Sequence, residues 1–249
     1  MTWGDLHEEL ARWRGTGRTP DFWWRDDDAT DLSAAVRRLL ALSAQSGVPL
    51  ALAVVPLQAE AELFQGLRCQ VMLHGSDHRN RAGPGEKKTE FPAAESDAAA
   101  LERLAAAGER LAHMAGDCYL RALAPPWNRL RQRLVGKLAG IGIYGLSCYG
   151  ARSCANAAAG VRQVNTHVDI IDWRAHRGFV GDERALDDVV KHLAARRSGA
   201  ADADEPTGLL THHAVHDADC WNFLERLFEF TRERGLRWAD PAQLFAAPR

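Results

Sequence analysis

The chain has 249 residues, of which 46% are hydrophobic and 26% charged, proportions that are ordinary for a globular protein with a large core. Its formal net charge of −2 argues against general binding to nucleic acids or anionic membranes. No apolar run approaches the ~20 residues of a membrane span, and the polar N-terminal segment lacks the apolar stretch of a signal peptide. We therefore expect a cytoplasmic protein with neither nucleic acid nor membrane as a partner.

The cysteines indicate neither a disulfide framework nor a zinc ribbon. Their number is odd, no two form a C-x-x-C pair, and several lie in apolar stretches. Small core side chains explain them best. They are Cys69, Cys118, Cys148, Cys154 and Cys220.

The first part of the chain alternates apolar runs with amphipathic helical patterns. In chain order these patterns predict an N-terminal helical extension over residues 1–20, a strand over 22–27, a helix over 32–45, and strands over 50–56 and 69–75. Residues 79–95 are polar and contain two prolines and two glycines. They predict a long loop, of the kind that often forms the wall or lid of a functional site.

The same alternation continues to the end of the chain. It predicts a helix over 97–113, a strand over 120–127, a helix over 129–139, strands over 143–149 and 161–170, a helix over 183–196, a linker over 198–206, a strand over 207–213, a helix over 219–234, and a short strand and helical turn over 236–246. Repeated strand–helix units favour a parallel sheet. About seven strands in one chain favour closure into a distorted (β/α)7-type barrel with the helices outside. We expect residues 1–249 to form a single catalytic domain.

Ionisable residues lie at the same end of each of these predicted strands or just beyond it. They are Asp26, Asp27 and Asp28 at the end of the first strand, His74 and then His78 at the third, Asp169 and then Asp172 at the sixth, and His212 and His213 at the seventh. The carboxyl ends of parallel barrel strands meet at one rim, where the active sites of such folds lie. The sequence therefore predicts one site at that rim.

The residue types indicate metal chemistry. Two histidines and one carboxylate bind a divalent first-row metal, most often zinc, and leave positions open for water and substrate. Such a metal lowers the pKa of a bound water toward neutrality. A second carboxylate then accepts the proton of that water, and a histidine opposite protonates the leaving group. Asp27 and His212 fit these two roles.

The first two motifs resemble those of the polysaccharide deacetylase family, carbohydrate esterase family four, whose fold is a distorted (β/α) barrel. In that family the first strand ends in two aspartates, the general base followed by a metal ligand. Here the pair is Asp26/Asp27 or Asp27/Asp28, and we prefer the second because divergent members read Arg-x-Asp-Asp. The second motif, His-x-x-x-His, implies His74 and His78 as the other metal ligands.

Three further motifs follow in the family order. Ala124–Trp127 matches Arg-x-Pro-Tyr/Trp, which implies that the Trp127 backbone N–H forms part of an oxyanion hole. Asp169–Trp173 matches the fourth motif, so that Asp172 or Asp169 orients the catalytic acid. Leu209–His213 matches the fifth, with the acid being His212 or His213.

One departure concerns the base. The arginine that steadies it in the family is replaced by Ala124. Its loss leaves the proton affinity of the base less controlled. Arg25 or Arg121 is expected to substitute from another direction.

The resemblance implies a zinc-dependent hydrolase that deacetylates an N-acetylated sugar or related small amide. Trp127 and Trp173 offer apolar faces for a sugar ring. Two alternatives remain: a catalytically impaired metal-binding barrel that acts as a binding module, and a non-haem iron enzyme, because two histidines and a carboxylate also form the iron site of oxygenases.

Overall fold

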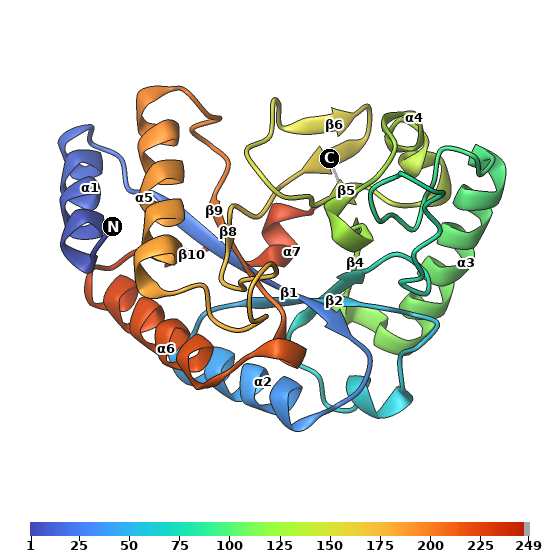
Figure 1. Cartoon of the computed structure of the whole chain (residues 1–249), viewed down its shortest axis with the longest axis horizontal. Helices are drawn as coiled ribbons and strands as arrows, with labels where there is room; N and C mark the ends of the chain where they lie inside the picture. The colour runs from blue at the N-terminus through green and yellow to red at the C-terminus, as the bar shows by residue number, and fades with distance from the viewer. Residues whose placement is uncertain (247–249) are drawn as a thin grey trace.

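The computed structural model describes residues 1–246. Ten strands in this part of the chain form one sheet with helices outside it (Figure 1). The strands are β1 (Asp21–Ala29), β2 (Leu50–Val54), β3 (Gln70–Leu73), β4 (Tyr119–Leu123), β5 (Gly145–Leu146), β6 (Asn156–Ala158), β7 (Val161–Gln163), β8 (Val168–Asp169), β9 (Thr207–Thr211) and β10 (Arg237–Trp238). Their hydrogen-bonded order is β6-β7-β5-β4-β3-β2-β1-β9-β8, and β10 pairs with β1. All these pairs are parallel except β6–β7.

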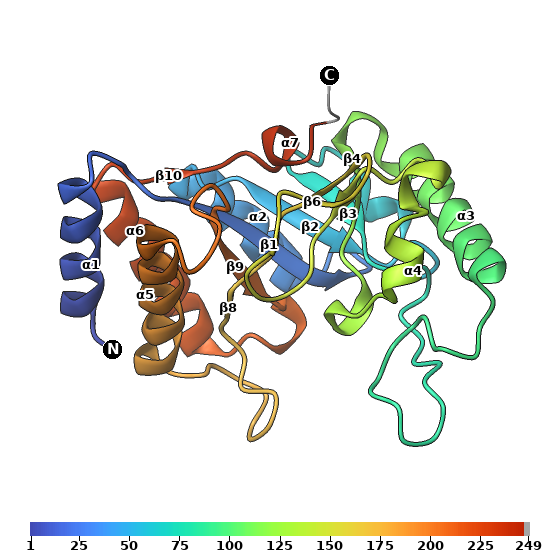
Figure 2. The same ribbon diagram turned by 90° about the horizontal axis from the view of Figure 1, so that it is seen from above.

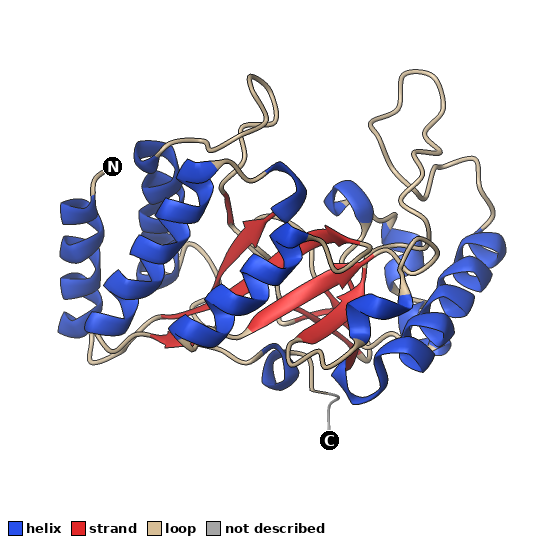
Figure 3. Ribbon diagram, turned by 90° about the horizontal axis from the view of Figure 1, so that it is seen from below, coloured by secondary structure: helices blue, strands red, loops and turns tan. Residues whose placement is uncertain are grey.

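Helices pack around the sheet, and two long loops extend from one side of it (Figure 2, Figure 3). The helices are α1 (Trp3–Gly15), α2 (Ala34–Ser46), α3 (Asp97–Ala115), α4 (Gln132–Val135), α5 (Asp182–Ser198), α6 (Ala218–Glu233) and α7 (Pro241–Leu244). Within residues 1–246, no helix combines the length and apolar character that crossing a bilayer requires.

The two ends of the strand order are joined through one extended segment. β7 and β8 belong to the same stretch, which pairs first with β5 and then with β9. Between them Thr166 bridges Tyr149 in parallel, and the His167 N–H donates to the Gly208 carbonyl at 2.7 Å. The sheet thus curls into a distorted barrel, and the expected fold class is confirmed.

Two predicted elements differ from the structure. The strand expected over 161–170 is broken into β7 and β8, because it changes partner midway. The helix expected over 129–139 is reduced to α4 and a separate 3-10 turn, Leu138–Ile141. Gly136 ends α4, consistent with the low helix propensity of glycine.

The alternation of side chains along β1 sets up the site. Successive residues of a strand point to opposite faces. Trp23 belongs to the core inside the barrel, whereas Trp24 packs on Phe228 of α6 in the outer layer. By the same alternation Arg25 and Asp27 lie on the inner face and Asp26 on the outer one.

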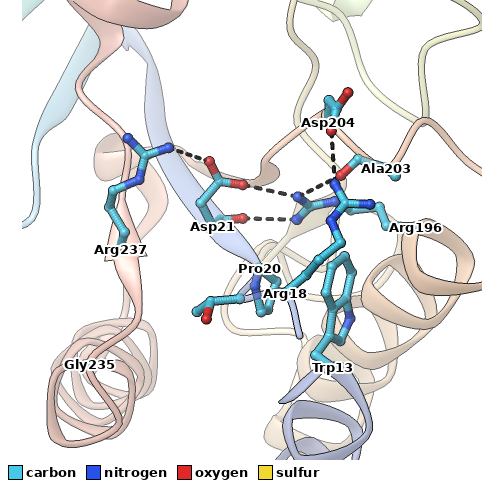
Figure 4. A pocket seen from close by; sticks show the side chains of 10 residues that line it. Trp13, Arg18, Pro20, Asp21, Arg196, Ala203, Asp204, Gly235 and Arg237 are labelled. Atoms are coloured by element: carbon cyan, nitrogen blue, oxygen red, sulfur yellow. Dashed lines mark hydrogen bonds and ion pairs between the residues drawn. The ribbon is translucent and has the colours of Figure 1, made fainter. Parts of the chain in front are cut away.

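A pocket of about 460 Å³ at the amino end of β1 is dominated by ion pairs (Figure 4). Asp21 accepts hydrogen bonds from Arg196 at 3.0 Å and from Arg237 at 2.7 Å. Arg18 pairs with Asp204 at 2.9 Å. The charged groups of this pocket satisfy one another, which indicates a structural role.

Candidate active site

A larger cavity, of about 970 Å³, opens at the carboxyl ends of the strands. Its lining includes side chains that follow β1, β3, β4, β8 and β9. Most of the residues singled out from the sequence lie in it: Asp27, Asp28, His74, His78, Trp127, Asp169, Asp172, Trp173 and His212. The carboxyl ends of the strands therefore meet at one rim of the barrel, as expected from the sequence.

Asp28, His74 and His78 form a compact group, here called the rim triad. The Asp28 Oδ1 atom lies 3.0 Å from Nε2 of His74 and 3.1 Å from Nε2 of His78. One donor atom from each residue lies within 4.8 Å of the others. His74 is buried, and the other two are partly exposed to the cavity.

The chemistry of the rim triad fits a cation. The Nδ1 atom of His74 lies 2.9 Å from the Ala124 carbonyl, which only accepts hydrogen bonds, so Nδ1 carries the proton. In neutral His74 the Nε2 lone pair therefore faces Asp28 Oδ1, which is itself buried without a hydrogen-bond partner. A divalent metal held by the three residues would remove this repulsion, and oriented imidazoles of this kind are usual in metal sites.

The backbone around the cavity is locally strained. The described non-glycine residues with positive φ are Asp28, His78, Trp127, Asn128 and Arg177, and all five line the cavity. Such conformations cost about 1–3 kcal/mol each and cluster at functional sites. In β1 the strain coincides with a break in register between Asp26 and Ala29, which separates Asp28 from the regular alternation.

Gly75, between the two histidines of the rim triad, is fixed by its surroundings. Its φ is +65°, and an added Cβ would lie 2.0 Å from Glu90 Oε2 and 2.7 Å from Pro126. Glu90 is fully buried and accepts hydrogen bonds from the Ser76 N–H and hydroxyl. The long polar loop that contains Glu90 is thus a packed wall beside the triad.

Asp27 has an arginine partner on its own strand. Arg25 Nε donates to Asp27 Oδ1 at 2.8 Å and Nη2 to Oδ2 at 3.0 Å, and both residues are buried. Arg25 also donates to the carbonyl and hydroxyl of Ser147 and to Asn128 Oδ1. Of the two arginines expected to substitute for the missing one, Arg25 pairs with Asp27 in a bidentate manner, whereas Arg121 is exposed on β4.

Asp26 and His213 form a separate buried pair on the outer face of β1. The His213 Nδ1 atom lies 2.5 Å from Asp26 Oδ1, and Asp26 Oδ2 accepts from the Thr211 hydroxyl and the His213 N–H. Although burial opposes it, this contact lowers the pKa of Asp26 and raises that of His213. His213 therefore does not line the cavity, contrary to its expected place, because Asp26 holds it behind the strand.

His212 lies inside the cavity, opposite the rim triad. Its Nε2 is 3.9 Å from Asp27 Oδ2, and its ring contacts Trp173 edge-on at 4.6 Å between centroids. Trp173 Nε1 donates to Asp169 Oδ2 at 2.8 Å, and burial raises the pKa of Asp169. Asp172 instead accepts from the backbone N–H groups of the following turn, so no direct hydrogen bond links either aspartate to His212.

Two groups at the site were missed from the sequence. Ser147 and Asn128 complete the hydrogen bonds of Arg25 and come from segments after β5 and β4. Glu90 supports the turn between the two histidines from the long loop. Nothing in the local pattern distinguishes these polar residues from surface ones; only the proximity of Arg25 to Asp27 was a readable signal.

A second group with metal-ligand residue types lies elsewhere. His167, His192 and Glu205, here called the buried cluster, have donor atoms within 4.8 Å of one another. The His167 Nδ1 accepts from the Gly208 N–H at 2.9 Å, so in the neutral ring Nε2 carries the proton, 3.3 Å from Glu205. The two rings stack at 3.4 Å with an angle of 15°, so their in-plane lone pairs do not converge. This cluster does not fit a metal.

The comparisons with known proteins agree with this architecture. No family model and no curated protein sequence matches the chain. A family 4 carbohydrate esterase from Streptomyces lividans superposes with a TM-score of 0.57 at 15% identity, covering 92% of this chain and 97% of the other. The peptidoglycan deacetylase PdaC from Bacillus subtilis gives 0.58 at 12% identity, covering 90% and 89%. The polysaccharide deacetylase Bc1974 from Bacillus cereus gives 0.52 at 13%, covering 89% and 91%. The chain therefore has the fold of the family 4 carbohydrate esterases, as its five motifs implied.

Proposed function

We propose that the protein is a metal-dependent hydrolase that removes the acetyl group from an N-acetylated sugar or related small amide. The observation that carries this proposal is the rim triad, with its converging lone pairs, beside an Asp27 held by Arg25 in an open cavity. The deacetylase names of the structural neighbours support the same class of reaction.

A divalent metal, for which the ligand set favours zinc, would be held by the rim triad and would supply a Lewis acid for the acyl carbonyl and for a water nucleophile. Asp27 accepts the proton of the attacking water. Arg25 occupies one direction of each Asp27 oxygen, which leaves a second lone pair on each for this step. Bidentate pairing fixes the orientation of the Asp27 carboxylate.

The other steps involve Trp127, whose ring contacts His78, and His212, which lies beside Asp27. The Trp127 N–H, the first after two prolines that have none, donates to the carbonyl oxygen as negative charge develops there. His212 donates a proton to the leaving nitrogen as the C–N bond breaks, and acetate and a free amine result. Trp173 contacts the His212 ring edge-on and is itself held by its hydrogen bond to Asp169, so the two residues together orient His212. His213 has no direct part.

The test is acetate release from acetamido sugars by protein stripped with a chelator and reloaded with zinc. We expect turnover that depends on the metal, and a loss of about 10³-fold in kcat for Asp27→Asn with the metal content unchanged. Asp21→Asn, at the opposite end of β1, is the matched control and should retain kcat. Absence of acetate from every substrate would contradict the proposal.

The same measurements separate the two alternatives. Tight metal binding without turnover on a broad amide panel would favour a binding module. Iron in the purified protein together with substrate-dependent oxygen uptake would favour an iron oxygenase. The bidentate Arg25–Asp27 pair argues for hydrolysis, because a binding module has no need for a positioned base.

A further inference from the structure

The cavity is lined by basic side chains that have no acidic partner. Lys88, Arg129, Arg174 and Arg177, here called the basic rim, are exposed and form no ion pair within the described residues. Arg184 also lines the cavity but pairs with Asp188 at 3.3 Å. An exposed cation at the mouth of a cavity attracts anions, because the low-dielectric walls focus its field.

The acidic side chains of the cavity, in contrast, each have a partner. Asp27 is neutralised by Arg25, and Asp28 belongs to the rim triad. Asp169 accepts from Trp173 and from the Ile171 N–H, while Asp172 caps the following turn. Asp169 and Asp172 keep their negative charge, because their partners are neutral N–H groups, but they are only partly exposed, whereas the basic rim is exposed. The exposed charged side chains that remain free to contact a ligand are therefore the four cations of the basic rim.

The basic rim is placed on two sides of the cavity. Lys88 lies on the loop after β3, and Arg129 Nη1 donates to its carbonyl at 2.7 Å, which ties the first two members together. Arg174 and Arg177 lie on the loop after β8. These are the two loops, teal and gold, that extend from the same side of the sheet (Figure 2). Arg177 has a φ of +57° and lies over the Trp173 ring at 5.6 Å, so its place is defined by the fold.

We propose that the substrate of this site is an acylated amino sugar that carries a phosphate ester. This inference rests on the proposed deacetylase function and specifies its substrate class. Guanidinium groups match the geometry of phosphate oxygens, and a dianion with several oxygens can contact cations from both loops. The phosphate occupies the basic rim, and the acetamido group reaches the rim triad.

The experiment compares N-acetylglucosamine with N-acetylglucosamine 1-phosphate on zinc-loaded protein. We expect kcat/KM to be at least about tenfold higher for the phosphate, with the difference shrinking as salt is added. N-acetylmuramic acid, which carries a carboxylate, should fall between the two. A UDP-linked sugar and a prenyl-diphosphate-linked sugar identify whether the phosphate belongs to a nucleotide or a lipid, according to which has the highest kcat/KM.

A charge-removal variant tests the residues. Arg174→Gln with Arg177→Gln should raise KM for the sugar phosphate about tenfold and leave kcat/KM for N-acetylglucosamine unchanged. Arg14→Gln with Arg68→Gln removes the same charge from exposed positions outside the cavity and should change neither value.

Binding measured by calorimetry provides a readout that does not depend on turnover. N-acetylglucosamine 1-phosphate should bind the zinc-loaded protein and bind the Arg174/Arg177 variant about tenfold more weakly. Equal turnover of the neutral and phosphorylated sugars would overturn this inference and leave the deacetylase function intact. Sugar-phosphate binding without acetate release would uphold the substrate class and contradict the proposed deacetylase function. Equal binding of the sugar phosphate by the wild type and the variant would overturn the inference.

Discussion

The rim triad and the buried cluster have the same composition, two histidines and one carboxylate, and lie in the same barrel. In the triad, His74 Nδ1 donates to a backbone carbonyl and its Nε2 faces the carboxylate with a lone pair. In the cluster, His167 Nδ1 accepts from a backbone N–H and its Nε2 faces Glu205 with a proton. A single backbone group on the far side of each ring therefore decides which set can bind a metal.

The rim triad and the buried cluster also differ in their access to solvent. The triad opens to a large cavity, and its residues carry backbone strain at Asp28 and His78. The buried cluster is closed to solvent, and Glu205 also accepts the backbone N–H groups of Arg152 and Asn165. Glu205 thus holds together the segments that lead into β8 and β9. The cluster stabilises the barrel, whereas the triad is available to a ligand.

The largest expected effect concerns metal affinity. Wild-type protein should bind one zinc ion, and His74→Ala should weaken binding by about 10³-fold or more, because one of three ligands is lost. The His192→Gln variant, altered in the buried cluster, should still bind one zinc ion per protein molecule. Zinc titration by calorimetry, with circular dichroism to verify folding, measures both. A second equivalent in the wild type that disappears with His192→Gln would break the comparison.

A loss of stability is expected at the buried pair behind the triad. Arg25→Met leaves Asp27 charged, buried and without its partner, which costs about 3–5 kcal/mol of unfolding free energy. Urea denaturation measures this cost. A cost below about 1 kcal/mol would mean that the pair does not hold the base.

Acid should weaken the buried cluster. Burial lowers the pKa of His192 from 6.5 to about 2 and also lowers that of His167. Below pH 6.5 the unfolded chain takes up protons that the native state excludes, so stability falls with decreasing pH. Each such proton contributes about 1.4 kcal/mol per pH unit. Urea denaturation from pH 6.5 to 4.5 should show this slope.

His192→Gln should reduce that slope, and the part due to His167 should remain. His113→Gln, at an exposed position on α3, is the matched control and should leave the slope unchanged. An unchanged slope in His192→Gln would show that the cluster is not the acid-sensitive element.

The smallest effect is expected at the amino end of β1. Arg237 pairs with Asp21, but its side chain is 64% exposed and Asp21 keeps Arg196 as a partner. Exposed ion pairs contribute little. Arg237→Gln should therefore cost less than about 1 kcal/mol in the same urea experiment. If Arg237→Gln lowered the unfolding free energy as much as Arg25→Met, the exposed pair at the amino end of β1 would be as stabilising as the buried pair at its carboxyl end.

Strand–helix alternation was enough to predict the barrel, and the ends of the strands were enough to predict where its ionisable residues meet. The alternation of side chains along β1 also indicates which arginine pairs with Asp27, because Arg25 is two residues away and lies on the same face of the strand. The break in the strand expected over 161–170 was not predictable, since its change of partner depends on β5 and β9 together.

The roles of the paired histidines needed tertiary information. His212 and His213 are adjacent at the end of β9, and only the position of Asp26 separates the buried one from the one in the cavity. The free nitrogen of His74 depends on the carbonyl of Ala124, which lies 50 residues away in the chain. The basic rim lies on the three segments that follow β3, β4 and β8, and their residue pattern gives no indication that they share a cavity.

The arginine on β1 also changes what a signature for such proteins must contain. Asp27, the proposed base, and its partner Arg25 are encoded within three consecutive residues, so the loop after β4 need not supply a cation. Ala124 is then free to be small, and its carbonyl orients His74. A pattern that demands arginine in that loop passes over chains built in this way. The pattern that describes this chain is Arg-x-Asp-Asp at the end of the first strand, followed by His-x-x-x-His.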